Sequence, residues 1–345
     1  MYGRNILSRV VDPSFNVCSG GRAELRISKA CRRKCVFCCE ARGMLSGARF
    51  MPLKEAVAIM DRLRTKGVGH ITFIGGEPTI HPDFHRIARA ARLLGYTVQV
   101  TTDGTGLADA SRAAGVLADI DELCLSVHWH NEALAREVTR FDSAFSDTEA
   151  AFENIKRFGR LRLFMCHSVI CSLNLAAVPD ICEYVFSKAR PGVLMLSQLI
   201  PWGRGRSSYD SLTVSMTDIV RVFPPVKRLL DVNGARLLIS GIPLCVLGGW
   251  GRFSNDLGFS PRVVLERGKV GAEEEVLSFK KSLVPPLNRI KTRECASCAL
   301  FEVCAGVFPD YLKKYGVSEL QPVSARSAGR LLRETTYVRE NSCPG

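Results

Sequence analysis

The chain has 345 residues, 46% of them hydrophobic, and its 47 Lys and Arg against 34 Asp and Glu give a formal net charge of +13. That length can bury one large core with a smaller appendage, while no apolar run reaches the roughly 18–20 residues of a membrane span. The first residues also lack the apolar core and cleavage site of a signal peptide, so we expect a cytoplasmic protein without a membrane partner. The basic residues are dispersed, which argues against nucleic-acid binding and leaves an anionic substrate, an anionic partner or solubility as reasons for the charge.

Strand-like apolar runs alternate with helical patterns along the first two thirds of the chain. We predict strands at 23–27, 70–73, 97–101, 122–127, 161–169 and 193–199, and helices at 54–66, 82–94, 107–117, 146–157 and 178–188. Strands that alternate with helices predict an α/β fold with βαβ units, a parallel sheet and right-handed crossovers. Six strands are too few for a closed eight-stranded barrel, so we predict a partial (β/α)6 barrel with its ligand at the carboxyl ends of the strands.

The chain is expected to divide into three parts. Residues 1–22 form an irregular lead-in, and residues 23–209 form the partial barrel. A glycine- and serine-rich connector follows Trp202, and from Phe223 the alternation of strands and helices is lost. We therefore place a second, smaller domain at 210–345.

Fourteen cysteines in a chain without a signal peptide favour metal or redox chemistry over a disulfide framework. Cys31, Cys35 and Cys38 are separated by three residues and then by two, and they follow the first predicted strand. Such thiolates can hold an iron–sulfur cluster, which normally takes four, and three ligands leave one iron open, as catalytic metal sites require. A zinc knuckle, or cysteines buried as small hydrophobic residues, are the alternatives, and Cys39 is a further thiol beside the three.

A second motif, Gly75-Gly76-Glu77-Pro78, follows the second predicted strand. Glycines let a backbone approach a ligand closely, Glu77 offers an acceptor and Pro78 stiffens the turn. By itself this is a common strand-to-loop turn. Because it comes one strand after the three cysteines, it adds a second ligand-binding feature at the same edge of the sheet.

The cysteine spacing, the aromatic Phe37 before the third cysteine and the turn at 75–78 together resemble the radical S-adenosylmethionine (SAM) enzymes. The resemblance implies a radical SAM barrel in which Cys31, Cys35 and Cys38 hold a [4Fe-4S] cluster. It also implies SAM as a cofactor, with the turn at 75–78 hydrogen-bonding the methionyl amino group. The expected reaction is reductive cleavage of SAM to a 5′-deoxyadenosyl radical that abstracts hydrogen from a substrate, with flavodoxin or ferredoxin as electron donor.

Later strand ends resemble further cofactor-binding positions of this family. Thr102 lies where relatives carry a threonine–asparagine–glycine turn, although Asp103 replaces the asparagine. Ser126 matches a serine that contacts ribose or the methionyl carboxylate, and Asn174 matches an asparagine position of many relatives. Ordinary capping of the next helix is the alternative for both residues. The segment 199–204 matches the one that flanks adenine.

Histidines near the strand ends are candidates for substrate contacts. His128 and His130 are two apart on a strand extension and would face one side, so we place them at the substrate mouth rather than at a zinc ion. His81 and His85 are four apart without a third ligand nearby, and we expect them on the surface.

A second cysteine group lies near the C-terminus. Cys295, Cys298 and Cys304 have a C-x2-C-x5-C spacing, which resembles the SPASM and twitch domains that hold auxiliary [4Fe-4S] clusters in many radical SAM enzymes. The cysteines of a full SPASM domain are incomplete here, which implies a shortened form with one auxiliary cluster. Cys245, after a proline turn, is the expected fourth ligand, with Cys343 as the alternative. A zinc ribbon is the alternative for the whole set.

Three functions are compatible with the resemblance. The first is a maturase that modifies a ribosomally synthesised peptide, the commonest setting of such C-terminal domains, although only some 22 residues precede the first strand. The second is a small-molecule oxidoreductase or cyclase in cofactor, nucleoside or natural-product biosynthesis. The third is a non-enzymatic metal-binding regulator. We favour the peptide maturase and assign no residue to the substrate radical.

Overall fold

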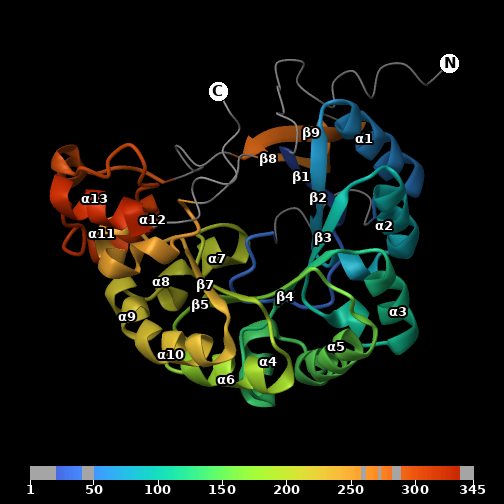
Figure 1. Ribbon diagram of the computed structural model, residues 1–345, viewed down its shortest axis with the longest axis horizontal. Helices are drawn as coiled ribbons and strands as arrows, with labels where there is room; N and C mark the ends of the chain where they lie inside the picture. The colour runs from blue at the N-terminus through green and yellow to red at the C-terminus, as the bar shows by residue number, and fades with distance from the viewer. Residues whose placement is uncertain (1–20, 41–49, 258–261, 271–272, 282–288, 335–345) are drawn as a thin grey trace.

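An open, almost entirely parallel sheet organises the molecule (Figure 1). The computed structural model describes residues 21–40, 50–257, 262–270, 273–281 and 289–334. Within these residues the sheet has nine strands in the order β7-β6-β5-β4-β3-β2-β1-β8-β9. Their bounds are β1 Gly21–Ser28, β2 Val68–Gly75, β3 Thr97–Thr102, β4 Glu122–Ser126, β5 Leu163–Ile170, β6 Val193–Gln198, β7 Arg236–Ser240, β8 Arg262–Val270 and β9 Glu273–Lys281.

Strands β1 to β6 lie at the six predicted positions, so the partial barrel is confirmed. Neighbouring strands from β7 to β8 run parallel, and β9 alone among the described strands runs antiparallel to its neighbour. Strands β7, β8 and β9 were not predicted; they extend the sheet at both edges and come from the expected second domain. The boundary at residue 210 therefore does not coincide with an edge of the sheet, and the domain division stays a prediction.

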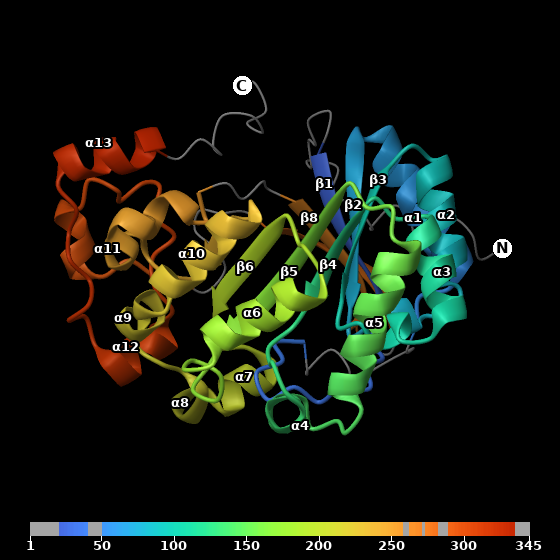
Figure 2. The ribbon, with the colours of Figure 1, turned by 60° about the horizontal axis from the view of Figure 1, so that its bottom comes forward.

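Helices connect the strands and cover the outer face of the sheet (Figures 1 and 2). Helices α1, α2, α3, α5 and α6 lie at predicted positions, whereas α4, which begins after the N-cap Asn131, was missed. The longer helices are α1 Leu53–Thr65, α2 Phe84–Leu93, α3 Ala110–Ala118, α4 Glu132–Thr139, α5 Ala144–Phe158, α6 Val178–Lys188, α10 Phe223–Asn233 and α13 Ala325–Glu334. The shorter ones are η2 Pro78–Ile80, η3 Thr105–Leu107, α7 Gly203–Ser207, α8 Tyr209–Leu212, α9 Met216–Arg221, α11 Leu244–Leu247, η4 Gly248–Phe253, η5 Arg293–Ser297 and α12 Pro309–Tyr315.

The two faces of the sheet differ in polarity because side chains alternate along each strand. In β1, Leu25 and its apolar neighbours are buried in the same core as the apolar side of α1. The opposite face, which lines the partial barrel, is polar. There Arg262 donates to Glu24 at 2.9 Å and Thr72 donates to Gln99 at 2.9 Å. A polar lining distinguishes this barrel from one filled by apolar side chains.

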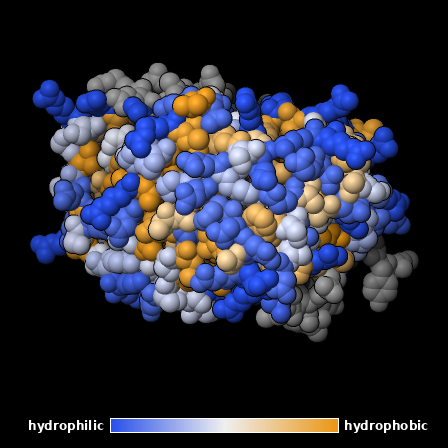
Figure 3. Space-filling model, turned by 90° about the horizontal axis from the view of Figure 1, so that it is seen from below, coloured by the Kyte–Doolittle hydropathy of each residue, from blue (hydrophilic) through white to orange (hydrophobic). Residues whose placement is uncertain are grey.

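The C-terminal helices α11, α12 and α13 gather beside β7, α9 and α10, at the left of Figure 1. The hydroxyl of Tyr311 on α12 accepts a hydrogen bond from the backbone N–H of Met216 at 2.8 Å, which ties this lobe to α9. Seen from below, the surface is mainly hydrophilic and its hydrophobic patches are small and separate (Figure 3). Among the described residues, the helices are all too short or too polar to cross a membrane.

Candidate active site

The loop that carries Cys31, Cys35 and Cys38 follows β1, so it lies at the carboxyl ends of the parallel strands. All three cysteines are half-buried, and none of them forms a disulfide. The loop is fastened to the end of α4, because the N–H of Lys34 donates to the Thr139 carbonyl at 2.8 Å and the N–H of Val36 donates to that of Val138 at 2.9 Å. The backbone thus fixes the loop without using the three thiols.

The glycine turn after β2 holds the segment that leads into this loop. The N–H of Gly76 donates to the Ser28 carbonyl at 2.8 Å, and the N–H of Glu77 donates to the Ala30 carbonyl at 2.7 Å. A Cβ on Gly76 would lie 2.5 Å from the Ala30 carbonyl oxygen, closer than any side chain tolerates. In this structure the close approach that the glycine allows is therefore to the cysteine loop itself.

Helix α7 fastens the other end of the loop. The backbone N–H of Arg204 donates to the Cys38 carbonyl at 3.0 Å, and its Nε donates to the Cys35 carbonyl at 3.1 Å. Gly203, with a φ of 55°, lies against the same carbonyl, since a Cβ there would be 2.5 Å from the Cys38 oxygen. The segment 199–204, expected beside adenine, thus contacts the cysteine loop.

Glu77 is completely buried and links the ends of β2 and β3. Its Oε1 accepts hydrogen bonds from the Thr79 N–H at 2.9 Å and the Thr102 hydroxyl at 2.7 Å, while its Oε2 accepts from the Asp103 N–H at 2.6 Å. Burial, followed by the charge of Asp103, raises the pKa of Glu77 to about 8. Pro78 is buried beside it and begins η2.

Ser126 and Asn174, the other predicted cofactor contacts, lie at the ends of β4 and β5. Ser126 is half-buried and in register with His167. Asn174 is fully buried; its Oδ1 accepts from the Cys171 N–H at 2.9 Å and its Nδ2 donates to the Val169 carbonyl at 2.9 Å. Neither residue caps a helix, because the N-cap positions of α4 and α6 belong to other residues, so the capping alternative is wrong.

Two histidine predictions differ from the structure. His128 does not line an open mouth: it is buried, with its ring edge-on to Phe37 at 4.7 Å between centroids. Burial, together with His167 and Arg33, lowers the pKa of His128 well below its ordinary value. His81 is buried rather than on the surface, and its Nε2 lies 2.8 Å from the Met51 carbonyl.

Arg33 is the site residue that the sequence did not single out. It lies in a basic run between Cys31 and Cys35, yet its side chain is 0% exposed. Its Nε is 3.7 Å from Oδ2 of Asp103, and its guanidinium lies 5.0 Å from the centre of the Trp129 ring. Burial by itself would raise the pKa of Asp103, but the charge of Arg33 and a hydrogen bond from Thr105 outweigh it and lower that pKa.

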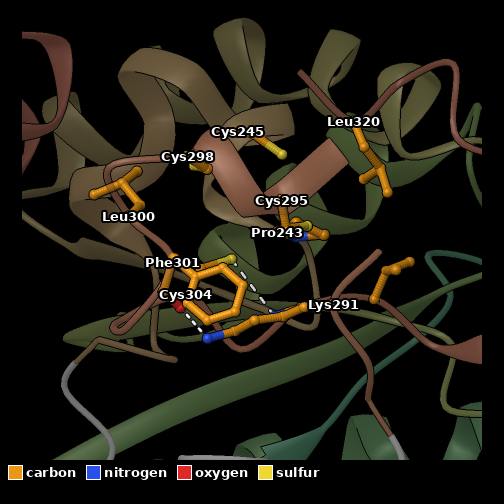
Figure 4. A pocket seen from close by; sticks show the side chains of 11 residues that line it. Pro243, Cys245, Lys291, Cys295, Cys298, Leu300, Phe301, Cys304 and Leu320 are labelled. Carbon is orange, nitrogen blue, oxygen red and sulfur yellow. Dashed lines mark hydrogen bonds between the residues drawn. The ribbon is translucent and has the colours of Figure 1, made fainter. Parts of the chain in front are cut away.

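The second cysteine group lines one cavity in the C-terminal lobe (Figure 4). Four cysteines line it: Cys245, Cys295, Cys298 and Cys304. Burial, followed by the nearby thiols of the other three, raises the pKa of Cys245 to about 11. Cys343, the alternative ligand, lies outside the described residues.

Backbone N–H groups point at two of these sulfur atoms. Val323 donates to Cys298 Sγ at 3.3 Å, and Gly306 donates to Cys304 Sγ at 3.5 Å. Hydrogen bonds to sulfur stabilise thiolate ligands and tune the reduction potential of iron–sulfur clusters. The donor set of four converging thiols with N–H partners therefore fits a cluster with four cysteine ligands.

Comparison with known sequences finds similarity over part of the chain. The sequence profile of the radical SAM superfamily matches residues 25–185. The chain is 25% identical over 187 residues to the mycofactocin maturase MftC of Mycolicibacterium smegmatis, which covers 54% of this chain and 46% of that protein. It is 24% identical over 195 residues to an S-adenosylmethionine-dependent nucleotide dehydratase of Flammeovirga pacifica. That alignment covers 54% of this chain and 65% of the dehydratase. The match thus spans less than two thirds of either relative.

Solved structures show that the fold is shared over more of the chain. SuiB of Streptococcus suis bound to S-adenosylmethionine superposes with a TM-score of 0.60 at 17% identity, covering 90% of this chain and 78% of SuiB. The structure of anSMEcpe with bound AdoMet gives a TM-score of 0.61 at 17% identity, and the superposition covers 92% of this chain and 96% of anSMEcpe. Residues 25–185, just under half of the chain, thus match the radical SAM superfamily in sequence.

Proposed function

We propose that this chain is a radical SAM enzyme that modifies a peptide substrate. The observation that carries the proposal is the position of Cys31, Cys35 and Cys38 at the carboxyl ends of the strands, in a loop that backbone hydrogen bonds to α4, to the glycine turn and to α7 hold in place. The match to the superfamily over residues 25–185 covers this loop and the turn at Glu77. When bound, a [4Fe-4S] cluster would supply the electron for reductive cleavage of SAM.

The residues of the chain contribute position and exclusion of water. Gly76 and Arg204 hold the two ends of the cysteine loop at the carboxyl ends of the strands. Glu77 would orient the turn toward the methionyl group of SAM through its backbone, because its own carboxylate is already satisfied by protein donors. Thr102, Ser126 and Asn174 mark the neighbouring strand ends where the nucleoside part of SAM would lie.

The cavity in the C-terminal lobe would hold an auxiliary [4Fe-4S] cluster. Cys245, Cys295, Cys298 and Cys304 provide the four thiolates that such a cluster takes. A cluster with four cysteine ligands has no open iron, so we assign it to electron transfer rather than to substrate binding. Lys291 lies on the wall of the cavity, its ammonium 3.9 Å from the Phe301 ring (Figure 4), and adds positive charge beside the cluster. Flavodoxin or ferredoxin is the proposed external donor.

Two relatives support a peptide as the substrate. MftC is a maturase, and SuiB has been solved with its precursor peptide SuiA bound; that structure superposes with a TM-score of 0.61 at 15% identity and covers 89% of this chain. A small-molecule substrate is the second candidate. It is favoured by the likeness to the nucleotide dehydratase and to a probable GTP 3′,8-cyclase of Pyrococcus horikoshii, which is 30% identical over 142 residues, 40% of this chain and 43% of that protein.

Substrate-dependent turnover separates these candidates. The reconstituted protein is incubated with SAM and dithionite, and the 5′-deoxyadenosine formed is measured. One set of reactions contains added peptides that are encoded by short reading frames beside its gene, and another set contains added GTP or CTP. We expect one such peptide to increase 5′-deoxyadenosine formation and to change in mass. An increase with GTP or CTP, accompanied by a modified nucleotide and no change in any peptide, would favour the small-molecule enzyme.

A further inference from the structure

Arg33 is a buried cation at the centre of the cysteine loop. Its Nη2 donates to the Ala144 carbonyl and to the Thr148 hydroxyl, each at 3.3 Å, which anchors the end of the side chain on α5. Its Nε and Nη1 are buried without a hydrogen-bond partner among the described residues. An arginine buried at this depth requires a compensating charge, and the ion-pair partner that the structure gives it is Asp103.

Asp103 stands between this guanidinium and the first cysteine. The same oxygen, Oδ2, lies 3.7 Å from Arg33 Nε and accepts from the Cys31 thiol at 3.5 Å. The other oxygen, Oδ1, accepts from the Thr105 N–H at 2.8 Å, so the carboxylate cannot rotate away without losing that bond. Asp103, which replaces the asparagine of the radical SAM turn, thus places a negative charge in direct contact with Cys31.

Ligation of a cluster changes this contact. A cysteine that binds iron does so as a thiolate, so Cys31 would no longer have the proton that it now donates to Asp103. Two negative groups would then face each other in a partly buried site, where charge repulsion is much stronger than in water. Arg33, whose Nε lies 3.7 Å from the same oxygen, offsets this repulsion.

We propose that Arg33 and Asp103 form a charge-compensating pair that lets the loop hold its cluster with a carboxylate beside Cys31. Both are positioning residues, and the inference rests on the proposed function in that it requires a cluster on Cys31, Cys35 and Cys38. Removal of Arg33 alone leaves the carboxylate uncompensated against the thiolate and weakens the cluster. Removal of both charges restores it, because the asparagine that replaces Asp103 no longer repels Cys31.

The test is a double-mutant cycle read out by cluster retention. The wild type, Arg33→Met, Asp103→Asn and the double variant are reconstituted anaerobically, and the rate of cluster loss in the presence of an iron chelator is followed by absorbance and by EPR of the SAM-responsive cluster. Arg32→Met is the matched control, because Arg32 is the exposed residue that precedes Arg33 and its replacement changes the net charge by the same amount as Arg33→Met. We expect Arg33→Met to lose its cluster on the order of tenfold faster than the wild type, and the double variant and Arg32→Met to lie within about threefold of it.

Equally fast cluster loss in Arg33→Met and in the double variant would overturn the proposal, because it would make Arg33 a packing residue only. Cluster retention in Arg33→Met equal to that of the wild type would overturn it as well. Asp103→Asn gives an independent test that does not depend on the folding of an Arg33 variant: it leaves the Arg33 charge unbalanced, so the midpoint potential of the cluster should become more positive. An unchanged potential would contradict the pair. If the wild type itself took up no iron, the proposed function would fail instead.

Discussion

The backbone N–H of Asp103 donates to Glu77 Oε2 at 2.6 Å, which joins the end of β3 to the end of β2. The same glutamate contacts the cysteine loop, since its own N–H donates to the Ala30 carbonyl. One buried residue, through its side chain and its backbone, thus couples three consecutive βα units of the sheet. Its role in this structure is to hold the site together.

Glu77→Ala should therefore destabilise the cluster-free protein. The change leaves several buried donors unsatisfied, and each such donor costs about 1–3 kcal/mol, so we expect a loss of about 2–4 kcal/mol in the free energy of unfolding. Urea unfolding measures this. Glu153→Ala, which removes an exposed carboxylate on α5 paired with Lys156, should change stability by less than about 1 kcal/mol. Equal effects of the two variants would contradict the role given to Glu77.

A second prediction concerns the glycine turn. Gly76→Ala would place a Cβ 2.5 Å from the Ala30 carbonyl and displace the segment that leads into the cysteine loop. We expect a loss of about 1–3 kcal/mol and reduced iron binding by Cys31, Cys35 and Cys38. Gly249→Ala is the control, because no atom lies within 4 Å of a Cβ built there. Iron content and urea unfolding check both variants; normal iron binding by Gly76→Ala would show that the close contact is not required.

The sequence predicted the barrel well, because strand–helix alternation is a local pattern that located β1 to β6. The cysteine spacings are local too; the structure brings Cys245, Cys295, Cys298 and Cys304 to one cavity, and their role as cluster ligands stays a prediction. Strands β8 and β9 were missed because charged residues such as Glu266 and Arg267 interrupt their apolar pattern. Helix α4 was missed because the residues just before it, His128 and His130, were interpreted as a strand extension.

Arg33 could not have been found in this way. An arginine within the run Arg32-Arg33-Lys34 is expected to be solvated, as its two neighbours are. Its burial follows from contacts with Asp103 and Trp129, which lie far along the chain and which only the folded sheet brings together. The buried state of His128 and His81 has the same cause: residues remote in sequence pack against them, Phe37 and His167 against His128, and Phe50 and Met51 against His81.

A third prediction concerns pH. His70 Nε2 lies 3.0 Å from Glu122 Oε2 in the barrel lining; burial, with the charges of Arg22 and Arg262, lowers the pKa of His70 despite that carboxylate. As pH falls through about 6.5, the unfolded histidine binds a proton and the folded one does not, so stability falls. Burial opposes ionisation of Glu122, but the hydrogen bond from His70 and the charge of Arg162 outweigh it and lower the pKa of Glu122, which adds a further loss of stability below about pH 4.3.

Urea unfolding of the cluster-free protein at pH 7.5, 6.5 and 5.5 measures this effect. The stability of the wild type relative to His70→Gln should decrease toward pH 5.5, by at most about 1.4 kcal/mol per pH unit. Glutamine keeps a donor toward Glu122 but does not titrate, so it isolates the histidine. A stability difference that stays constant, or that grows as the pH falls, would show that His70 is not held neutral.

A fourth prediction concerns the auxiliary cavity. Cys245 faces the same space as Cys295, Cys298 and Cys304, so Cys245→Ala should reduce the iron content from about eight to about four per chain. Cleavage of SAM should persist, because the other cluster is intact. Cys39→Ala, which changes an exposed cysteine outside this cavity, should retain about eight irons. Full iron content in Cys245→Ala, with iron loss in Cys343→Ala, would assign the fourth ligand to the tail.

The most direct measurement of the central claim is the fate of SAM. The anaerobically reconstituted wild type is incubated with SAM and dithionite, and the products are separated by liquid chromatography and mass spectrometry. We predict slow formation of 5′-deoxyadenosine and methionine by the wild type and none by Cys35→Ala, in which the candidate cluster loses one of its three ligands. S-adenosylhomocysteine as the sole product, or stoichiometric zinc without iron–sulfur absorption or SAM cleavage, would contradict the account.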